Sequence, residues 1–220
     1  MTKLSILLCA HCPNASYDDL LVKAIISIYE QSYKDYKLLI VLDACWEGTL
    51  SKVNDVITSS TEIIIRNKKE GLAKAKNAGL ERINTEYVAF LDADDEYLPG
   101  KLEKQMNFIE KSKVDFLGTL ATIKNKGQIY PSGFSVGQYE THEQIYNRIF
   151  QENIITHGSM LIRKKALDEL GGYHDVRDPS GYPNGMEDWD LWRRAISSGY
   201  KFHQLQERLY MLTIGTSVER

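Results

Sequence analysis

Residues 87–95 read Tyr87-Val88-Ala89-Phe90-Leu91-Asp92-Ala93-Asp94-Asp95, and this run is the most informative part of the sequence. Its first five residues are apolar, aromatic or β-branched, which is typical of a buried strand. Three carboxylates follow directly. In a parallel sheet, ligands bind beyond the carboxyl ends of the strands. The run therefore predicts a core strand that leads into a binding site.

Apolar runs and helical patterns alternate on the N-terminal side of this run. Short apolar runs predict strands at residues 4–9, 38–42 and 62–65. Apolar residues at helical spacing predict helices at residues 20–28 and 72–83, and another helix follows at 98–109. Alternation of this kind predicts an α/β fold, with a mostly parallel central sheet flanked by helices in a Rossmann-like domain.

The pattern is looser after residue 116. Residues 124–142 predict a loop or hairpin, and residues 174–185 predict a mobile loop rich in Gly, Pro, Ser and Asp. Strands are expected at 158–163 and 200–205, and helices at 164–170 and 186–198. No linker divides the chain, so residues 1–220 are expected to form a single domain.

Composition narrows the class of protein. A chain of 220 residues with 43% hydrophobic and 26% charged residues is expected to be a soluble globular domain. Its net charge of −3 implies no general attraction to nucleic acid or anionic membranes. No apolar run is long enough for a transmembrane segment, and residues 4–8 are too short for a signal peptide. We expect a cytoplasmic location, with peripheral attachment to a membrane left open.

The carboxylates after the fourth strand have two interpretations. Alternate residues of an extended segment point the same way, so Asp92 and Asp94 can share one target. A divalent cation, Mg²⁺ or Mn²⁺, is the usual partner of such carboxylates. Alternatively, the residues form a solvated turn in which Asp95 caps the next helix.

A second acidic cluster, Glu187-Asp188-Trp189-Asp190, opens a predicted helix. Acidic residues in a first turn suit the helix dipole, which needs no function. The functional interpretation is a general base that takes a proton from a hydroxyl nucleophile. Of the nearby tryptophans, Trp192 is expected in the core, and Trp189 is left open.

Six segments together resemble the family-2 glycosyltransferases of the GT-A fold, over nearly the whole chain. They are residues 4–11 (Leu-Ser-Ile-Leu-Leu-Cys-Ala-His), 40–43 (Ile-Val-Leu-Asp), 67–79 (from Asn through Gly-Leu-Ala-Lys-Ala-Lys-Asn-Ala-Gly), 90–95 (Phe-Leu-Asp-Ala-Asp-Asp), 171–173 (Gly-Gly-Tyr) and 187–188 (Glu-Asp).

The resemblance implies a role for each part of the site. Asp188 would be the catalytic base, and Asp94 with Asp92 would hold Mn²⁺ or Mg²⁺. Glu187 and Trp189 would face the acceptor or the donor sugar. The positions implied for nucleotide-sugar binding are Ala10, His11, Asp43, Lys76, Asn77, Asp92 and Ala93.

The implied reaction moves a sugar from a nucleotide-diphosphate donor, a UDP-sugar, to a hydroxyl group with inversion. The acceptor would be a glycan, a lipid-linked sugar or a protein, and no nucleic-acid partner is expected. Residues 1–120 would form the half that binds nucleotide-sugar and metal. Residues 121–220 would form the acceptor half that carries the base.

Two departures from the family pattern stand out. Residues 43–48 read Asp-Ala-Cys-Trp-Glu-Gly, where the family usually continues Asp-Asp-Gly-Ser. Residues 212–217 lack the Arg or His that related enzymes often place there, sometimes as a further metal ligand. The metal would then have fewer protein ligands, or His157 or His203 would supply one, although both histidines also suit a structural role.

Three alternatives stay open at this point. Cys9 and Cys12 have the spacing of a redox motif, and a zinc site from Cys9, His11, Cys12 and Cys45 is possible on ligand types. A non-catalytic nucleotide-binding module of the same fold is the second. A nucleotidyltransferase is the third, although it would want a Gly-rich phosphate loop that the sequence lacks.

Overall fold

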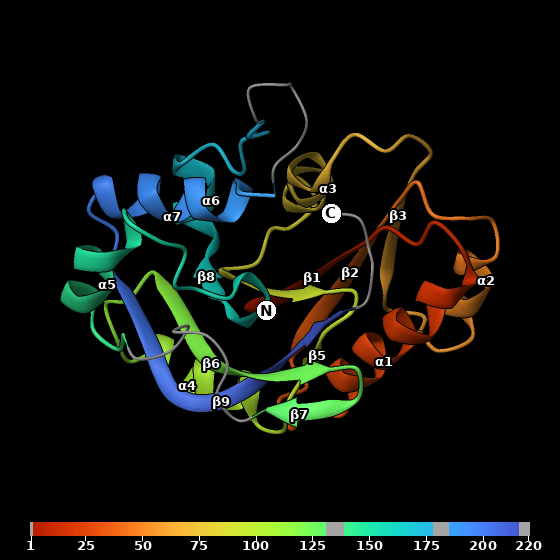
Figure 1. The fold of residues 1–220 in the computed structure, drawn as a ribbon, viewed down its shortest axis with the longest axis horizontal. Helices are drawn as coiled ribbons and strands as arrows, with labels where there is room; N and C mark the ends of the chain where they lie inside the picture. The colour runs from red at the N-terminus through yellow and green to blue at the C-terminus, as the bar shows by residue number, and fades with distance from the viewer. Residues whose placement is uncertain (1, 131–138, 178–184, 216–220) are drawn as a thin grey trace.

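The computed structural model describes residues 2–130, 139–177 and 185–215. Within them the chain forms a nine-stranded sheet covered by helices, which confirms the predicted α/β fold (Figure 1). The strands follow the order β3-β2-β1-β4-β8-β6-β9-β5, and β7 pairs with β6.

The elements have the following bounds. The strands are β1 (Leu4–Ala10), β2 (Tyr36–Asp43), β3 (Glu62–Arg66), β4 (Tyr87–Asp92), β5 (Glu96–Tyr97), β6 (Phe116–Asn125), β7 (Gln128–Tyr130), β8 (Leu161–Arg163) and β9 (Phe202–Ile214). The α-helices are α1 (Asp18–Tyr29), α2 (Thr49–Asn54), α3 (Leu72–Leu80), α4 (Lys101–Ile109), α5 (His142–Ile149), α6 (Lys164–Glu169) and α7 (Glu187–Ser197). The short 3₁₀ helices are η1 (Ala15–Tyr17) and η2 (His157–Ser159).

The parallel half of the sheet sets the place of the site. Strands β3, β2, β1 and β4 are parallel neighbours, and β1 lies between β2 and β4. In register, Cys9 of β1 lies opposite Asp92 of β4 and Val41 of β2. The loops that follow these three strands therefore leave the same edge side by side, as the sequence predicts.

Side chains alternate along the strands and feed two cores, one on each face of the sheet. The alternation is clearest in β2, where Leu38, Ile40 and Leu42 pack with α1 and α4. Their neighbours Leu39 and Val41 pack on the opposite face, whose core includes residues of α3, α5, α6 and α7. Figure 1 shows the helices on both sides of the sheet.

The second half of the sheet is mixed. β8 runs antiparallel to β4 and β6, whereas β9 runs parallel to β6. The β6–β9 register shifts between Thr119 and Ala121, and such irregularities bend a strand. β9 is accordingly drawn as a long bent ribbon in Figure 1. Its far end pairs with β5 and so returns to the residues that follow β4.

The structure adds elements that the pattern did not predict. The new elements are α2, α5, β5, β6 and the two 3₁₀ helices, and β9 continues to Ile214, well beyond the predicted end at residue 205. The hairpin expected near residue 124 is formed by β6 and β7. Helix α5 has a signal that sequence reasoning missed, because Thr141 and Gln144 form a capping box. Most of the loop predicted at 174–185 lies outside the described residues.

Lys101 at the start of α4 is fully buried, and it gives a prediction about stability. Its Nζ donates to Gln105 Oε1 at 2.7 Å and lies 4.1 Å from the Tyr97 ring centroid. Burial lowers the pKa of Lys101 well below the ordinary 10.5. Between those two pKa values the unfolded chain binds more protons than the folded chain, so stability rises with pH.

We expect Lys101→Met to remove this rise. From pH 7 to pH 9, the free energy of unfolding of the wild type should increase relative to the variant, by up to about 1.4 kcal/mol per pH unit. Urea titrations at both pH values measure the difference. Lys111→Met, at an exposed position just after α4, is the control. Equal slopes in the wild type and Lys101→Met would contradict the prediction.

Candidate active site

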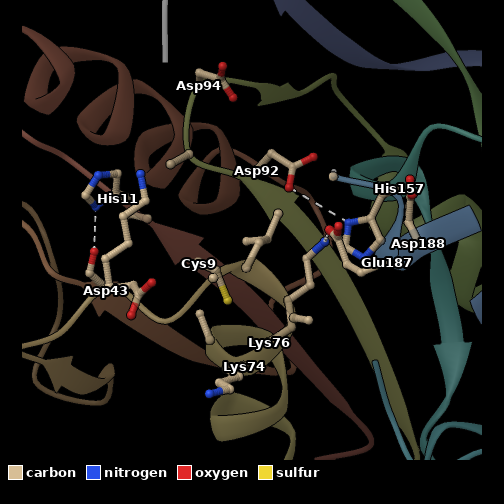
Figure 2. A pocket seen from close by; sticks show the side chains of 18 of the residues that line it. Cys9, His11, Asp43, Lys74, Lys76, Asp92, Asp94, His157, Glu187 and Asp188 are labelled. Carbon is tan, nitrogen blue, oxygen red and sulfur yellow. Dashed lines mark hydrogen bonds and ion pairs between the residues drawn. The ribbon is translucent and has the colours of Figure 1, made fainter. Parts of the chain in front are cut away.

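A cavity of about 1170 Å³ lies at the carboxyl edge of β1, β2 and β4. Most of the predicted site residues line it. Figure 2 shows His11 and Asp43 on one side, Asp92 near the centre, and Glu187 and Asp188 on the other side. The predicted site residues that line the cavity are Ala10, His11, Asp43, Lys76, Asp92, Ala93, Asp94, Glu187 and Asp188.

The side of the cavity next to β2 combines a histidine with a buried ion pair. His11 Nδ1 lies 2.7 Å from the backbone oxygen of Asp43, which joins the loops after β1 and β2. The Asp43 carboxylate is buried and lies 3.4 Å from Arg66 Nη1. Burial raises the pKa of Asp43, and Arg66 opposes that rise. Arg66, the last residue of β3, pairs in register with Asp43 and was not predicted as a site residue from the sequence.

The acidic segment after β4 is a turn, which corrects the extended geometry expected from the Asp-x-Asp spacing. The amide of Asp95 donates to the carbonyl of Asp92 at 3.1 Å. As a result, the Asp92 and Asp94 side chains point in different directions, and Figure 2 shows Asp92 directed toward His157. Both still line the cavity.

Asp95 holds β9 instead of capping the next helix. One carboxylate oxygen accepts from the Tyr210 hydroxyl and the other from the Thr213 amide, both at 2.7 Å. Burial and the nearby Asp92 and Asp94 carboxylates raise the pKa of Asp95 well above its ordinary value. Asp95 therefore anchors the C-terminal end of β9 to the turn after β4.

A buried lysine neutralises the opposite wall. Lys76 on α3 donates to Glu187 Oε1 at 2.9 Å, and both residues are buried. Burial opposes the charge on Lys76, but the carboxylates of Glu187, Asp92 and Asp188 outweigh it, so the pKa of Lys76 is raised. This cation allows several carboxylates to face one cavity.

Asp188 is held by two hydrogen bonds at the start of α7. Asn153 Nδ2 donates to one carboxylate oxygen at 3.1 Å, and the amide of Trp189 donates to the other at 2.6 Å. Burial raises the pKa of Asp188, and Lys76 counteracts it. A raised pKa moves a carboxylate toward the range that suits a general base. Asn153, which also lines the cavity, was not anticipated from the sequence.

Two predicted site residues are not among the residues that line the cavity in the described part of the chain. The Asn77 side-chain amide donates to the Tyr173 carbonyl at 2.8 Å and accepts from the Tyr173 amide at 2.9 Å. Trp189 donates its indole N–H to the Ile149 carbonyl and faces Arg193. On a helix, residues two apart point about 200° apart, so the position of Glu187 in the cavity places Trp189 on nearly the opposite side of α7. Trp192 is fully buried, as expected.

The cysteines do not form the pair that their spacing suggests. Cys9 packs with the core on one face of the sheet, and Cys12 with the core on the other. The Cys12 amide donates to the Cys45 sulfur at 3.2 Å. All three cysteines are free thiols, and burial raises the pKa of Cys9 to about 12. A strand-end Cys-x-x-Cys redox pair is therefore not assembled.

Of the two histidines considered as further metal ligands, only His157 lies at the cavity. His203 stacks on Phe108 with ring centroids 4.5 Å apart, and it is not a lining residue. His157 Nδ1 lies 3.8 Å from Asp92 Oδ1. Within the described residues no three His, Cys, Asp or Glu side chains form a ready-made metal cluster. A cation here would need ligands from a bound molecule as well.

Comparisons with known proteins agree with the fold. The family profile described as Glycosyl transferase family 2 matches residues 9–171, so the chain belongs to this family. EpsE of Bacillus subtilis (strain 168), a putative glycosyltransferase, is 32% identical over 200 residues, covering 86% of this chain and 66% of EpsE.

A second relative and a solved structure extend the comparison. WfaP of Escherichia coli, a UDP-Glc:alpha-D-GlcNAc-diphosphoundecaprenol beta-1,3-glucosyltransferase, is 30% identical over 83% of this chain and 67% of its own length. The mannosyltransferase PcManGT from Pyrobaculum calidifontis, in complex with GDP-Man and Mn²⁺, has a TM-score of 0.70 at 16% identity. That match covers 98% of this chain and 58% of PcManGT, and it shows the shared GT-A fold.

The match to this chain spans 66% of the length of EpsE and 67% of the length of WfaP. Each relative is therefore about half as long again as the region that it shares with this chain. No helix among the described residues has the length and apolar character to cross a membrane.

Proposed function

We propose that this chain is the catalytic domain of an inverting, metal-dependent glycosyltransferase that moves a sugar from a UDP-sugar to a hydroxyl acceptor. One observation carries the proposal. The same cavity is lined by Asp43 on one side, Asp92 near its centre, Asp94 toward the top of the view in Figure 2, and Asp188 on the side opposite Asp43. This order matches what the reaction needs, namely a pocket for the nucleobase, a site for the diphosphate and a carboxylate that acts as general base.

The donor nucleoside would lie against the loops after β1 and β2. There, the buried Asp43 carboxylate and the adjacent His11 offer hydrogen-bonding groups to a base, with Ala10 leaving room beside them. By its name WfaP uses a UDP-glucose donor, which supports uracil as the nucleobase of the donor bound by this chain. PcManGT is in complex with GDP-Man, so the identity of the nucleobase is the first point to test.

A divalent cation fits the centre of the cavity by the chemistry of its donors. Asp92 and Asp94 point in different directions but both line the cavity, so each would offer hard oxygen ligands to a cation there, and Mg²⁺ or Mn²⁺ commonly completes its coordination with substrate phosphates. When bound, the cation stabilises the negative charge that develops on the leaving diphosphate. Lys76 holds positive charge on the opposite wall and keeps Glu187 in place there.

Asp188 would act as the general base. Removal of the hydroxyl proton makes the acceptor oxygen nucleophilic, and the oxygen attacks the anomeric carbon on the side opposite the leaving diphosphate. The C–O bond to the diphosphate breaks as the new bond forms, so the anomeric centre inverts. Asp188 takes up the proton and forms no covalent bond. The acceptor, a glycan, a lipid-linked sugar or a protein, would approach from this side, and WfaP by name uses a diphosphoundecaprenol-linked sugar.

The metal proposal predicts that Asp94→Ala weakens Mn²⁺-dependent nucleotide binding. A ligand that binds only the folded state raises the free energy of unfolding of the protein by RT ln(1 + [L]/Kd). The shift in melting temperature on addition of UDP or GDP, measured once with Mn²⁺ and once with EDTA, reports this stabilisation. We expect a Mn²⁺-dependent shift for one nucleotide in the wild type and a loss of at least about 10-fold in affinity for Asp94→Ala.

Asp35→Ala, which removes an exposed carboxylate that does not line the cavity, is the matched control and should bind like the wild type. Equal nucleotide binding with Mn²⁺ and with EDTA would refute the metal. No binding of either nucleotide would refute the donor site. Nucleotide binding without any UDP release from UDP-sugars would favour a non-catalytic binding module.

A further inference from the structure

We propose that His157 is a positioning residue that holds the Asp92 carboxylate in the orientation used for the donor and its cation, and that Tyr173 fixes the His157 ring for this task. The proposal rests on the proposed function. It assigns a role to the Gly171-Gly172-Tyr173 segment, which the fold and the reaction otherwise leave unexplained.

His157 reaches the cavity from η2, which lies beside the end of β4. The residue is only 7% exposed and lies in an aromatic cage, with ring centroids 4.8 Å from Phe90 and 5.9 Å from Trp192. The cage fixes the plane of the imidazole ring. Nδ1 is buried and makes no hydrogen bond within the described residues, and it faces Asp92 Oδ1 at 3.8 Å. Figure 2 shows this pair.

The other ring nitrogen determines what Nδ1 offers. His157 Nε2 lies 2.8 Å from the Tyr173 hydroxyl. If the hydroxyl donates to Nε2, the single proton of a neutral imidazole lies on Nδ1 and points at the Asp92 carboxylate. In the opposite arrangement, a nitrogen lone pair would face a carboxylate, which is electrostatically unfavourable. The geometry therefore favours the Nδ1–H tautomer.

Tyr173 is itself locked in place by the segment around it. Asn77 on α3 donates to the Tyr173 carbonyl and accepts from the Tyr173 amide, at 2.8 and 2.9 Å. This close approach requires the preceding glycine, because a Cβ on Gly172 would lie 2.5 Å from Asn77 Oδ1 and because Gly172 has φ +72°. Asn77 thus acts on the site through Tyr173 and His157.

The gap between Nδ1 and Asp92 is longer than the roughly 3.0 Å of an N–H···O hydrogen bond. Hydrogen bonds in active sites often tighten only when the ligand is bound. Carboxylates that ligate metals are commonly oriented by a neighbouring donor, and removal of that donor typically weakens metal affinity about 10- to 100-fold. We place His157 in this role toward Asp92.

Four proteins test the proposal: the wild type, His157→Phe, His157→Asn and Tyr173→Phe. Isothermal titration with UDP in the presence of Mn²⁺ gives the affinity of each, and EDTA gives the metal-free reference. We expect His157→Phe to bind about 10-fold more weakly with Mn²⁺ and unchanged with EDTA. His157→Asn keeps an N–H donor at the position of Nδ1, so it should recover affinity to within about 3-fold of the wild type. Tyr173→Phe should fall between them.

A second measurement reads the ring directly and needs no ligand. In ¹⁵N-histidine-labelled wild type, the two-bond nitrogen–proton correlations of His157, assigned by their loss in His157→Asn, should show the Nδ1–H tautomer. Tyr173→Phe should release this preference.

The proposal is overturned if His157 carries its proton on Nε2, or if His157→Phe binds UDP and Mn²⁺ like the wild type. It is also overturned if His157→Asn is as weak as His157→Phe, because the effect would then come from ring packing alone. A wild type that binds neither UDP nor GDP with Mn²⁺ would overturn the proposed function instead, and the tautomer would still decide the His157 contact.

Discussion

Asp188→Asn is expected to slow UDP release from UDP-sugars by about 10²- to 10⁴-fold, the range for loss of a general base. The asparagine keeps the size of the side chain and can still contact Asn153 and the Trp189 amide, but it cannot accept the acceptor proton. Nucleotide affinity should stay within about 2-fold of the wild type, because in the proposed function the donor nucleotide would lie toward Asp43 and Asp92. Steady-state rates and titration with UDP and Mn²⁺ separate these two effects.

Asp190→Asn is a matched control for this change. Asp190 lies two residues further along α7 and pairs with Arg194 at 2.7 Å, and it is not a cavity-lining residue. The same loss of charge there should leave the rate of UDP release within about 3-fold of the wild type. A near-normal rate in Asp188→Asn would remove Asp188 as the base. An equal loss in both variants would point to the stability of α7 instead.

Lys76→Met is expected to destabilise the fold by about 3–5 kcal/mol, the usual cost of removing one partner of a buried ion pair. The variant leaves the buried Glu187 without the cation at 2.9 Å and takes away the charge that balances Asp92 and Asp188. Urea denaturation measures the loss. The double variant Lys76→Met/Glu187→Leu should recover much of it, because a hydrophobic pair can replace a buried ion pair.

Lys74→Met is the control for Lys76. It lies two residues away on α3, is exposed and pairs with Glu70 at 3.2 Å, so its effect should stay within about 1 kcal/mol. A Lys76→Met variant as stable as Lys74→Met would show that the ion pair contributes little. A double variant no more stable than the single one would mean that Lys76 acts through its packing.

The N-terminal half of the protein was predictable from the sequence. Each parallel strand is a short apolar run, and each of the longer helices between strands has one apolar face, so local patterns and tertiary structure agree. The positions of Asp43 and of Asp92 at the carboxyl edge follow from the same patterns. Three short elements were too brief for a pattern to show, namely the six-residue helix α2, the 3₁₀ helix η1 and the two-residue strand β5.

Prediction was poorer where long-range pairing decides the structure. β9 was predicted as a short strand, because residues 206–208 are polar and exposed and interrupt its apolar pattern. It continues to Ile214 because it pairs with β6 and β5 and because Asp95 binds its end. No local signal in the sequence of β9 reports those partners.

Periodicity and residue type were enough to specify the α/β class, the loops that meet at the cavity and the carboxylates that those loops carry. How the carboxylates are held depends on three-dimensional packing. The turn that separates the Asp92 and Asp94 side chains is local. Packing directs Asp95 to β9, pairs Lys76 with Glu187 and sets His157 against Asp92. Such contacts join residues up to 118 positions apart, and no local pattern selects them because each depends on which strands and helices become neighbours.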